Sequence, residues 1–172
     1  MTRILGISAF YHDSAAVLLA DGEIVAALQE ERFSRRKHDS GFPRRAISAC
    51  LNLGACRISE VDFVVFYEKP FLKFERILET HLRNSPYSWR SFLKALPVWL
   101  KDKLWTKDNL QKELDYDGPL FFSEHHEAHA ASAFYPSPFR RAAILTVDGV
   151  GEWTTTALGR GEDHRIALEE EI

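Results

Sequence analysis

The chain has 172 residues, a formal net charge of -3 and 45% hydrophobic residues, which is an ordinary composition for a globular protein with one sizeable core. The mild acidity argues against general nucleic-acid binding, and no apolar run approaches the roughly 20 residues of a membrane span. Charges and strand-like alternation interrupt the first residues, which do not follow a signal-peptide layout, so we expect a cytoplasmic protein.

Three apolar runs open the chain, at residues 3–10, 14–20 and 23–31, and their alternation and β-branched side chains are typical of strands. The Asp21-Gly22 pair between the last two runs is a hairpin signal. The sequence therefore predicts an antiparallel meander of three strands, followed by a polar loop rich in arginine and lysine.

The middle of the chain is predicted to alternate between helices and strands. Residues 43–53 have helical spacing, whereas the runs at 61–68 and 118–124 are typical of strands. Between those strands, residues 71–114 are predicted to form an amphipathic helical insert rich in Trp, Phe and Lys, which we assign to packing or partner contact. A further strand is expected at 142–149.

The end of the chain resembles its beginning. Residues 3–31 and 142–171 each contain an apolar strand, a short turn, a second strand, a hairpin and a third strand ending in glutamates. This pattern predicts an internal repeat whose second copy stops after its third strand, although two unrelated meanders could share it. We therefore expect a first lobe over residues 1–140, and the first three strands of an incomplete second lobe over residues 141–172.

An alanine-rich run, SEHHEAHAASAF, holds three histidines. Because a helix repeats about every 3.6 residues, His125 and His129 share one face, and two imidazoles so placed can bind one metal ion. The next strand places Asp148 at the same edge of the sheet, where α/β folds position their sites, so these three residues are predicted metal ligands. His126 points about 100° away and is assigned to packing or to support of the ligands. Surface histidines that bind nothing are the alternative.

Two turns, one after the first strand of each copy, are candidates for chemistry. Gly149 and Gly151 flank Val150, and glycines there let backbone N–H groups approach a phosphate, unless they only serve a tight hairpin. His12 and Asp13 occupy the matching turn of the first copy. His12 could act as a general acid or base, and a plain exposed turn is the alternative.

A basic cluster follows the first meander. Arg32, Arg35, Arg36 and Lys37 fall within six residues and could clamp a phosphate or a carbamoyl-type oxyanion. A solvated charged surface is the alternative.

Four segments in this order, ILGISAFYHDSAAVLL, QEERFSRRKHDSGFP, HHEAHAASAFYPSPF and ILTVDGVGEWTTT, resemble the carbamoyltransferases of the nodulation, cephamycin and tobramycin type. The resemblance runs from residue 3 to about residue 156. It implies an α/β lobe of the actin, Hsp70 and sugar-kinase superfamily, with an RNase H-like mixed sheet in which alternating helices and strands follow the meander. It also implies closeness to the universal tRNA threonylcarbamoyl-transfer protein.

The resemblance implies a reaction as well. In that family carbamoyl phosphate and ATP form carbamoyl-adenylate in a C-terminal domain, and the N-terminal domain passes the carbamoyl group to a hydroxyl of a sugar or natural-product acceptor. The metal is a divalent ion, with iron expected first and zinc or manganese as alternatives. Carried over onto this chain, the ligands are His125, His129 and Asp148, the base is His12, the carbamoyl-adenylate ligand is Lys37, and the phosphate-binding backbone is that of Gly149, Val150 and Gly151.

Two parts of the family pattern are missing from this chain: the aspartate of the second lobe that is the fourth metal ligand, and the adenylate-forming domain. The fragment alone is therefore expected to be inactive and to bind metal weakly. The expected partners are a small-molecule hydroxyl acceptor, carbamoyl phosphate and the missing second lobe and domain, with a homodimer left open and with no nucleic acid or membrane span.

Three rival interpretations remain. A plain kinase or ATPase of the same superfamily is disfavoured, because Ser8 stands where an acidic residue is usual and the histidine pair has no role there. The tRNA threonylcarbamoyl branch shares the histidine pair, but the YHDSAA and RRKHDSGFP segments fit the small-molecule branch better. A truncated, non-catalytic paralogue is the third.

Overall fold

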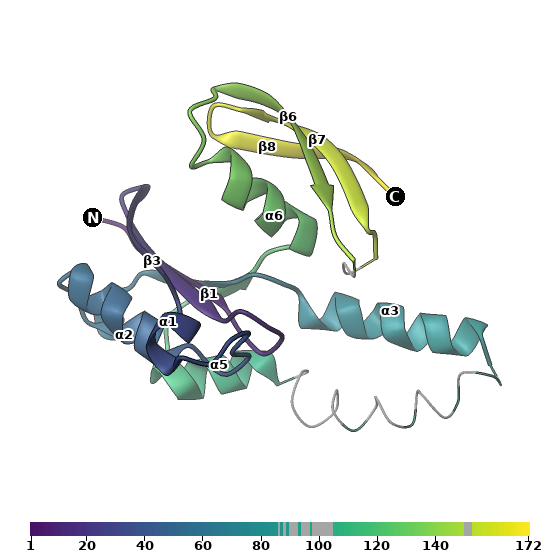
Figure 1. Cartoon of the computed structure of the whole chain (residues 1–172), viewed down its shortest axis with the longest axis horizontal. Coiled ribbons are helices and arrows are strands. Elements are labelled where there is room, and N and C mark those ends of the chain that lie inside the picture. The colour runs from purple at the N-terminus through teal and green to yellow at the C-terminus, as the bar shows by residue number, and fades with distance from the viewer. Residues whose placement is uncertain (86, 88, 90–92, 94–96, 98–104, 150–152) are drawn as a thin grey trace. The chain divides into compact units, whose positions relative to one another are not determined.

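The computed structural model describes residues 1–85, 87, 89, 93, 97, 105–149 and 153–172 of the chain (Figure 1). The chain packs as two compact units. The first unit comprises residues 1–67 and 107–122, and the second comprises residues 68–106 and 123–172. Each unit is described by itself below, and the predicted division into lobes at residue 140 stays a prediction.

The first unit contains a five-stranded mixed sheet with the strand order β3-β2-β1-β4-β5. β1 pairs antiparallel with β2 and parallel with β4, and β4 pairs parallel with β5. The strands are β1 (Arg3–Ser8), β2 (Ala15–Ala20), β3 (Glu23–Gln29), β4 (Phe63–Phe66) and β5 (Leu120–Phe122). The predicted opening meander is therefore confirmed, as are the two later strands.

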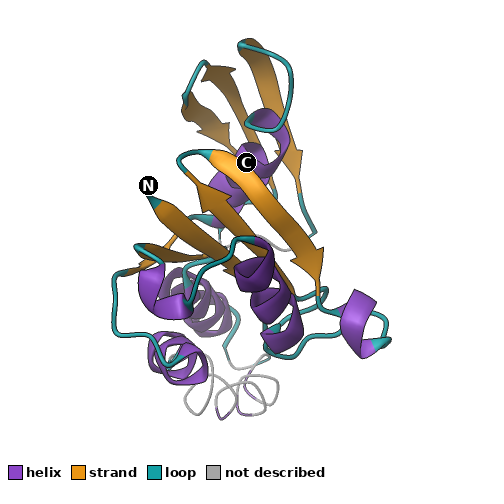
Figure 2. Ribbon diagram, turned by 90° about the vertical axis from the view of Figure 1, so that its left-hand side faces the viewer, coloured by secondary structure: helices purple, strands orange, loops and turns teal. Residues whose placement is uncertain are grey.

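The hairpin between β2 and β3 follows from its two turn residues. Asp21 has φ 49° and Gly22 has φ 87°, and a two-residue turn with positive φ at both positions matches the right-handed twist of the strands it joins. The pairing sets Ala20 opposite Glu23 and carries on to Ala15 opposite Gln29. A bulge interrupts this register between Leu18 and Leu19. The strands of this sheet, and those of the three-stranded sheet in the second unit, are drawn in orange in Figure 2.

The helices of the first unit are α1 (Glu31–Ser34), α2 (Arg44–Leu53) and α5 (Thr106–Leu114), with a 3-10 turn at Ile58–Glu60. α1 was not expected within the polar loop. It ends where Arg35 adopts a left-handed backbone with φ 60°. Helix α2 follows Pro43 and ends at Gly54, as predicted.

The core of the first unit lies between the sheet and α2. Alternate residues of the strands point to this face, among them Leu5, Ile7 and Leu18, and they pack against Ile47 and Cys50 of α2. Burying one such aliphatic side chain contributes about 1.5–3 kcal/mol. Both cysteines of the chain are free, as expected, and Cys50 is fully buried whereas Cys56 is half-buried.

The second unit contains a three-stranded antiparallel sheet in the order β6-β7-β8, with the same topology as the first meander. Its elements are α3 (Pro70–Arg83), α6 (His125–Phe134), β6 (Arg141–Val147), β7 (Thr156–Glu162) and β8 (Arg165–Glu171). The predicted helical insert at residues 71–114 thus includes α3 and α5, and most of the residues between these helices lie outside the described part.

Helix α6 packs against one face of β6, β7 and β8. Its Ala130 and Phe134 form a small core with Ile144 of β6. Gly161 of β7 makes this packing possible, because a Cβ atom there would overlap the ring of Phe134. Among the described residues, no helix is both long and apolar enough to cross a membrane.

Candidate functional site

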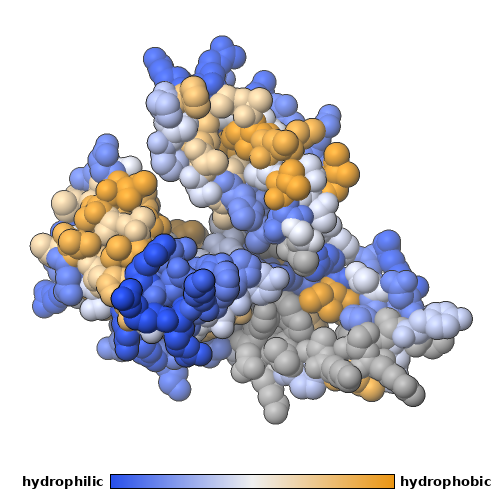
Figure 3. Space-filling model, in the orientation of Figure 1, coloured by the Kyte–Doolittle hydropathy of each residue, from blue (hydrophilic) through white to orange (hydrophobic). Residues whose placement is uncertain are grey.

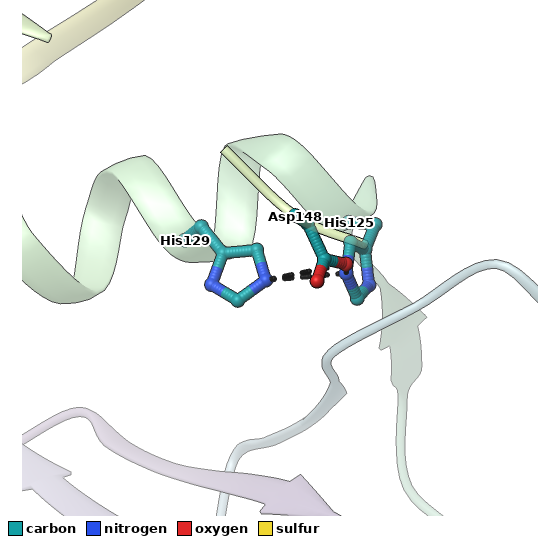
Figure 4. A group of neighbouring side chains, drawn as sticks. All are labelled: His125, His129 and Asp148. Carbon is teal, nitrogen blue, oxygen red and sulfur yellow. Dashed lines mark hydrogen bonds and ion pairs between the residues drawn. The ribbon is translucent and has the colours of Figure 1, made fainter. Parts of the chain in front are cut away.

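The three predicted metal ligands converge beside the first two turns of α6 (Figure 4). His125 Nε2 lies 2.6 Å from Asp148 Oδ2 and 3.1 Å from His129 Nε2. His129 Nε2 and Asp148 Oδ2 are 4.0 Å apart. The histidines meet because they are one helical turn apart, and the carboxylate joins them because it directly follows β6, the strand against which α6 packs.

Two pKa values are shifted within this cluster. Burial lowers the pKa of His129, and the neighbouring His125 lowers it further, although Asp148 acts in the opposite direction. For Asp148, burial acts to raise the pKa, but hydrogen bonds from His125 and from the Gly149 N–H outweigh it, and the pKa lies below its ordinary value. Both shifts favour the neutral imidazole and the ionised carboxylate, which are the forms that ligate a metal.

The donor set fits a divalent transition-metal ion. Nitrogen and carboxylate ligands lie about 2.0–2.2 Å from such an ion, so neighbouring ligand atoms are about 3–3.5 Å apart. The three separations of 2.6, 3.1 and 4.0 Å scatter around this range. Two histidines and one carboxylate are a facial set that suits iron and leaves positions open for other ligands, and zinc or manganese also accept these donors. Metal binding itself stays a prediction.

His126 has a different role from the two neighbouring histidines. It is buried, with Nε2 2.9 Å from the carbonyl oxygen of Thr154 and Nδ1 2.8 Å from Thr146 Oγ1. Because a carbonyl can only accept, Nε2 donates to Thr154, and in the neutral ring Nδ1 accepts from the Thr146 hydroxyl. These bonds fix α6 to β6 and agree with the packing or supporting role predicted for His126.

The predicted phosphate-binding turn is described only in part. The Gly149 N–H donates to Asp148 Oδ1 at 2.7 Å, so this amide supports the carboxylate of the metal cluster. Apart from its chain neighbours, no residue that the structure describes has an atom within 4 Å of a Cβ atom placed at Gly149. Val150 and Gly151 lie outside the described residues, and the phosphate-binding role of the turn stays a prediction.

The first unit holds the other two predicted site residues. His12 is exposed in the turn between β1 and β2, and its Nδ1 lies 2.7 Å from Asp13 Oδ2. Lys37 is exposed in the loop after α1, where Figure 3 shows strongly hydrophilic side chains gathered. Their roles as base and as carbamoyl-adenylate ligand stay predictions.

The sequence analysis missed His38 and the part that Asp13 plays between two histidines. His38 Nδ1 lies 3.0 Å from Asp13 Oδ1, so one carboxylate bridges His12 and His38. A signal was present: the tripeptide His-Asp-Ser occurs at residues 12–14 and again at residues 38–40. The repeated tripeptide does not show, however, that Asp13 contacts His38.

The model of the family described as "Carbamoyltransferase N-terminus" matches residues 3–172. The chain belongs to the carbamoyltransferase family. Two relatives extend this finding. An uncharacterised protein of Synechocystis, sll1178, is 53% identical over 180 residues, which cover 100% of this chain and 29% of the relative. The nodulation protein NolNO of Sinorhizobium fredii is 34% identical over 161 residues, which cover 91% of this chain and 22% of that protein.

The carbamoyltransferase chain described here therefore spans less than a third of the length of these two relatives. Among solved structures, YeaZ from Pseudomonas aeruginosa aligns with a TM-score of 0.50 at 14% sequence identity, covering 99% of this chain and 65% of YeaZ. That likeness confirms the predicted α/β fold, and at such low identity it concerns the fold alone. Membership of the actin, Hsp70 and sugar-kinase superfamily stays a prediction.

Proposed function

We propose that this chain is the N-terminal part of an O-carbamoyltransferase, which moves a carbamoyl group from carbamoyl-adenylate to a hydroxyl of a sugar or natural-product acceptor. The observation that carries the proposal is the convergence of His125, His129 and Asp148 in a chain that matches the carbamoyltransferase N-terminus over residues 3–172. Carbamoyl phosphate and ATP are the sources of the carbamoyl-adenylate, which forms in a part of the longer protein beyond this chain.

In the proposed transfer one bond to the carbamoyl carbon forms and another breaks. The acceptor oxygen forms a bond to the carbamoyl carbon, and the bond between that carbon and the phosphate oxygen of the adenylate breaks. AMP leaves with the electron pair, and the hydroxyl proton passes to the imidazole of His12. Lys37, exposed and positively charged, binds the carbamoyl-adenylate.

His125, His129 and Asp148 would hold a divalent ion, with iron expected first. Such an ion supplies positive charge that stabilises the negative charge developing on carbamoyl and phosphate oxygens. The part of the residues is to present two neutral imidazoles and one carboxylate at a fixed place. His126 keeps α6 against β6 and thereby keeps the three donor groups together.

The metal is tested by elemental analysis of the chain after dialysis against buffer that contains a divalent metal, because this fragment is expected to bind the ion weakly. We expect a divalent metal in the wild type and its loss, by about 10-fold or more, in the double variant His125→Ala/His129→Ala. His164→Ala is the matched control, because His164 is exposed on the hairpin between β7 and β8 and is not in the cluster. Equal metal content in the double variant and the wild type would contradict the assignment of the ligands.

The reaction is tested with radiolabelled carbamoyl phosphate, ATP and a panel of sugar acceptors. We expect label to reach the acceptor when this chain is part of a protein of the length of its relatives. We expect no turnover by residues 1–172 alone, even with carbamoyl-adenylate supplied. Turnover by the short chain would refute the proposed dependence on the rest of the protein, and absence of transfer by the long protein would refute the proposed function.

A further inference from the structure

One carboxylate in the first unit binds two exposed histidines. Asp13 Oδ2 lies 2.7 Å from His12 Nδ1, and Asp13 Oδ1 lies 3.0 Å from His38 Nδ1. An ionised carboxylate can only accept, so both imidazoles donate from Nδ1. In a neutral imidazole the other nitrogen, Nε2, is then a bare acceptor. The carboxylate therefore sets the same tautomer in both rings.

The backbone holds the two histidines near one another. The Phe10 N–H donates to the Ser40 carbonyl at 2.9 Å, and the Ser14 N–H donates to the Asp39 carbonyl at 2.8 Å. The buried Ser14 hydroxyl adds a third bond, to the Gly41 carbonyl at 2.6 Å. The turn after β1 and the loop after α1 are thus joined on both sides of the histidine pair.

This arrangement costs conformational energy. Phe10, Asp13 and His38 have φ values of 71°, 52° and 53°, in the left-handed region that side chains other than glycine rarely adopt. Each such residue costs on the order of 1 kcal/mol or more, and strained residues of this kind cluster at functional sites. The ion pairs give little in return, because the side chains of His12 and His38 are 59% and 75% exposed and exposed pairs contribute about 0–1 kcal/mol. The two ion pairs by themselves therefore do not offset the strain.

We propose that Asp13 is a positioning residue of the carbamoyl-acceptor site, which holds His12 and His38 with Nδ1 protonated and with both Nε2 atoms facing the acceptor as proton or hydrogen-bond acceptors. This inference rests on the proposed function. His12 accepts the proton of the reacting hydroxyl, and His38 accepts a hydrogen bond from a second hydroxyl of the same acceptor. An acceptor with more than one hydroxyl, such as a sugar, is the chemical class that this pair suits.

The pKa of Asp13 supports this assignment. Hydrogen bonds from His38 first, and from His12 second, hold the pKa of Asp13 below its ordinary value. Asp13 therefore remains an ionised acceptor for both imidazoles at neutral pH.

The test uses two variants that keep the backbone of residue 13. Asparagine tolerates a left-handed backbone and glycine adopts it freely, so neither Asp13→Asn nor Asp13→Gly strains the turn. An amide presents one oxygen and one NH2 group, so Asp13→Asn can accept from only one imidazole and should switch the other to the Nε2-protonated form. Asp13→Gly should release both rings. Asp163→Asn, in the exposed ion pair with Arg140, is the control.

The first readout is the tautomer of each ring, from two-bond proton–nitrogen correlation spectra of the chain labelled with 15N-histidine, above pH 8. We expect Nδ1–H at His12 and His38 in the wild type and in Asp163→Asn, with a change at one ring in Asp13→Asn and at both in Asp13→Gly. Nε2–H at both rings of the wild type would overturn the inference, and this readout requires no enzyme activity.

The second readout is carbamoyl transfer by the protein of full family length. We expect kcat to fall at least about 10-fold in Asp13→Asn and Asp13→Gly, while the KM for carbamoyl phosphate changes less than about 3-fold. His38→Ala should raise the KM for a polyhydroxyl acceptor more than the KM for a simple alcohol. Unchanged kcat in both Asp13 variants would overturn the inference. A wild-type protein without transfer would overturn the proposed function, and the catalytic role of Asp13 with it, while the tautomers would still show whether Asp13 holds both rings.

Discussion

The two three-stranded meanders of this chain have the same topology but differ in the burial of equivalent side chains. In the first meander Leu5 pairs with Leu18 across the strands, and they are 0% and 1% exposed because α2 packs over them. In the second meander Leu145 pairs with Leu158 in the same way, and they are 63% and 38% exposed. Figure 3 shows hydrophobic atoms gathered over this second sheet.

The likeness of the two meanders in sequence and topology makes this difference informative. Residues 4–8 and 144–148 align one to one, so Leu5 corresponds to Leu145, and Ile7, which is 3% exposed, corresponds to Val147, which is 72% exposed. Strand pattern alone therefore does not decide burial. The helix that packs on a given face does, and in the first unit α2 (residues 44–53) covers the face on which Leu5 lies. In the second unit α6, which precedes the meander, covers the opposite face, where Ile144 lies.

The largest expected effect is the difference in stability lost when Leu5 and its counterpart Leu145 are each truncated. Leu5→Ala should lower the free energy of unfolding by about 2–5 kcal/mol, because it removes a fully buried side chain and leaves a cavity. Leu145→Ala should change it by less than about 1 kcal/mol, because this side chain is already in contact with water. Urea unfolding of both variants, followed by circular dichroism, measures the two values. A cost for Leu145→Ala equal to that of Leu5→Ala would show that the second face is covered in solution.

A smaller effect tests the covered face of the second meander. His126→Ala should lower the free energy of unfolding of the second unit by about 1–3 kcal/mol, because it removes the donor to the Thr154 carbonyl and leaves the buried Thr146 hydroxyl only its 3.4 Å bond to the Ala157 carbonyl. It should also weaken metal binding by about 10-fold, because α6 loses its attachment to β6. Isothermal titration with a divalent metal, with His164→Ala as the control, measures the second effect. Unaltered affinity in a folded His126→Ala variant would count against the supporting role.

The smallest effect concerns pH and the turn after β1. The folded-state pKa of Asp13 is lowered by His38 and His12, so the folded protein binds fewer protons there than the unfolded chain does. This contribution to stability is present above the ordinary value of 3.8 and is lost as the pH falls through the lowered pKa. Between pH 5 and pH 3, Asp13→Asn should therefore lose less stability than the wild type. Urea unfolding at several pH values measures this difference. If the free energy of unfolding of the two proteins changed with pH in parallel, the Asp13 carboxylate would not contribute to the pH dependence of stability.

The parts of this molecule that the sequence predicts are those set by short-range patterns. Asp21-Gly22 specified its turn, and the spacing of His125 and His129 placed both on one face of a helix. Asp148 does meet that pair, but the predicted reason was wrong, because β5 and β6 belong to different sheets and share no edge. Asp148 reaches the histidines because α6 packs against β6, the strand that Asp148 follows. The contact of His38 with Asp13 did not follow, because it joins residues 25 apart through two irregular loops. The exposure of Leu145 depends on which face of the second sheet α6 covers, and no local pattern in β6 encodes that choice.

Cys50, on the buried face of α2, gives the first unit a built-in chemical reporter. Burial raises the pKa of its thiol, so little of the reactive thiolate forms at neutral pH. An alkylating reagent can reach this sulfur only when α2 separates from the strands, whereas the half-buried Cys56 is accessible more readily. The rate at which Cys50 of the natural protein is alkylated would then measure how often α2 separates from the sheet, without any engineered label.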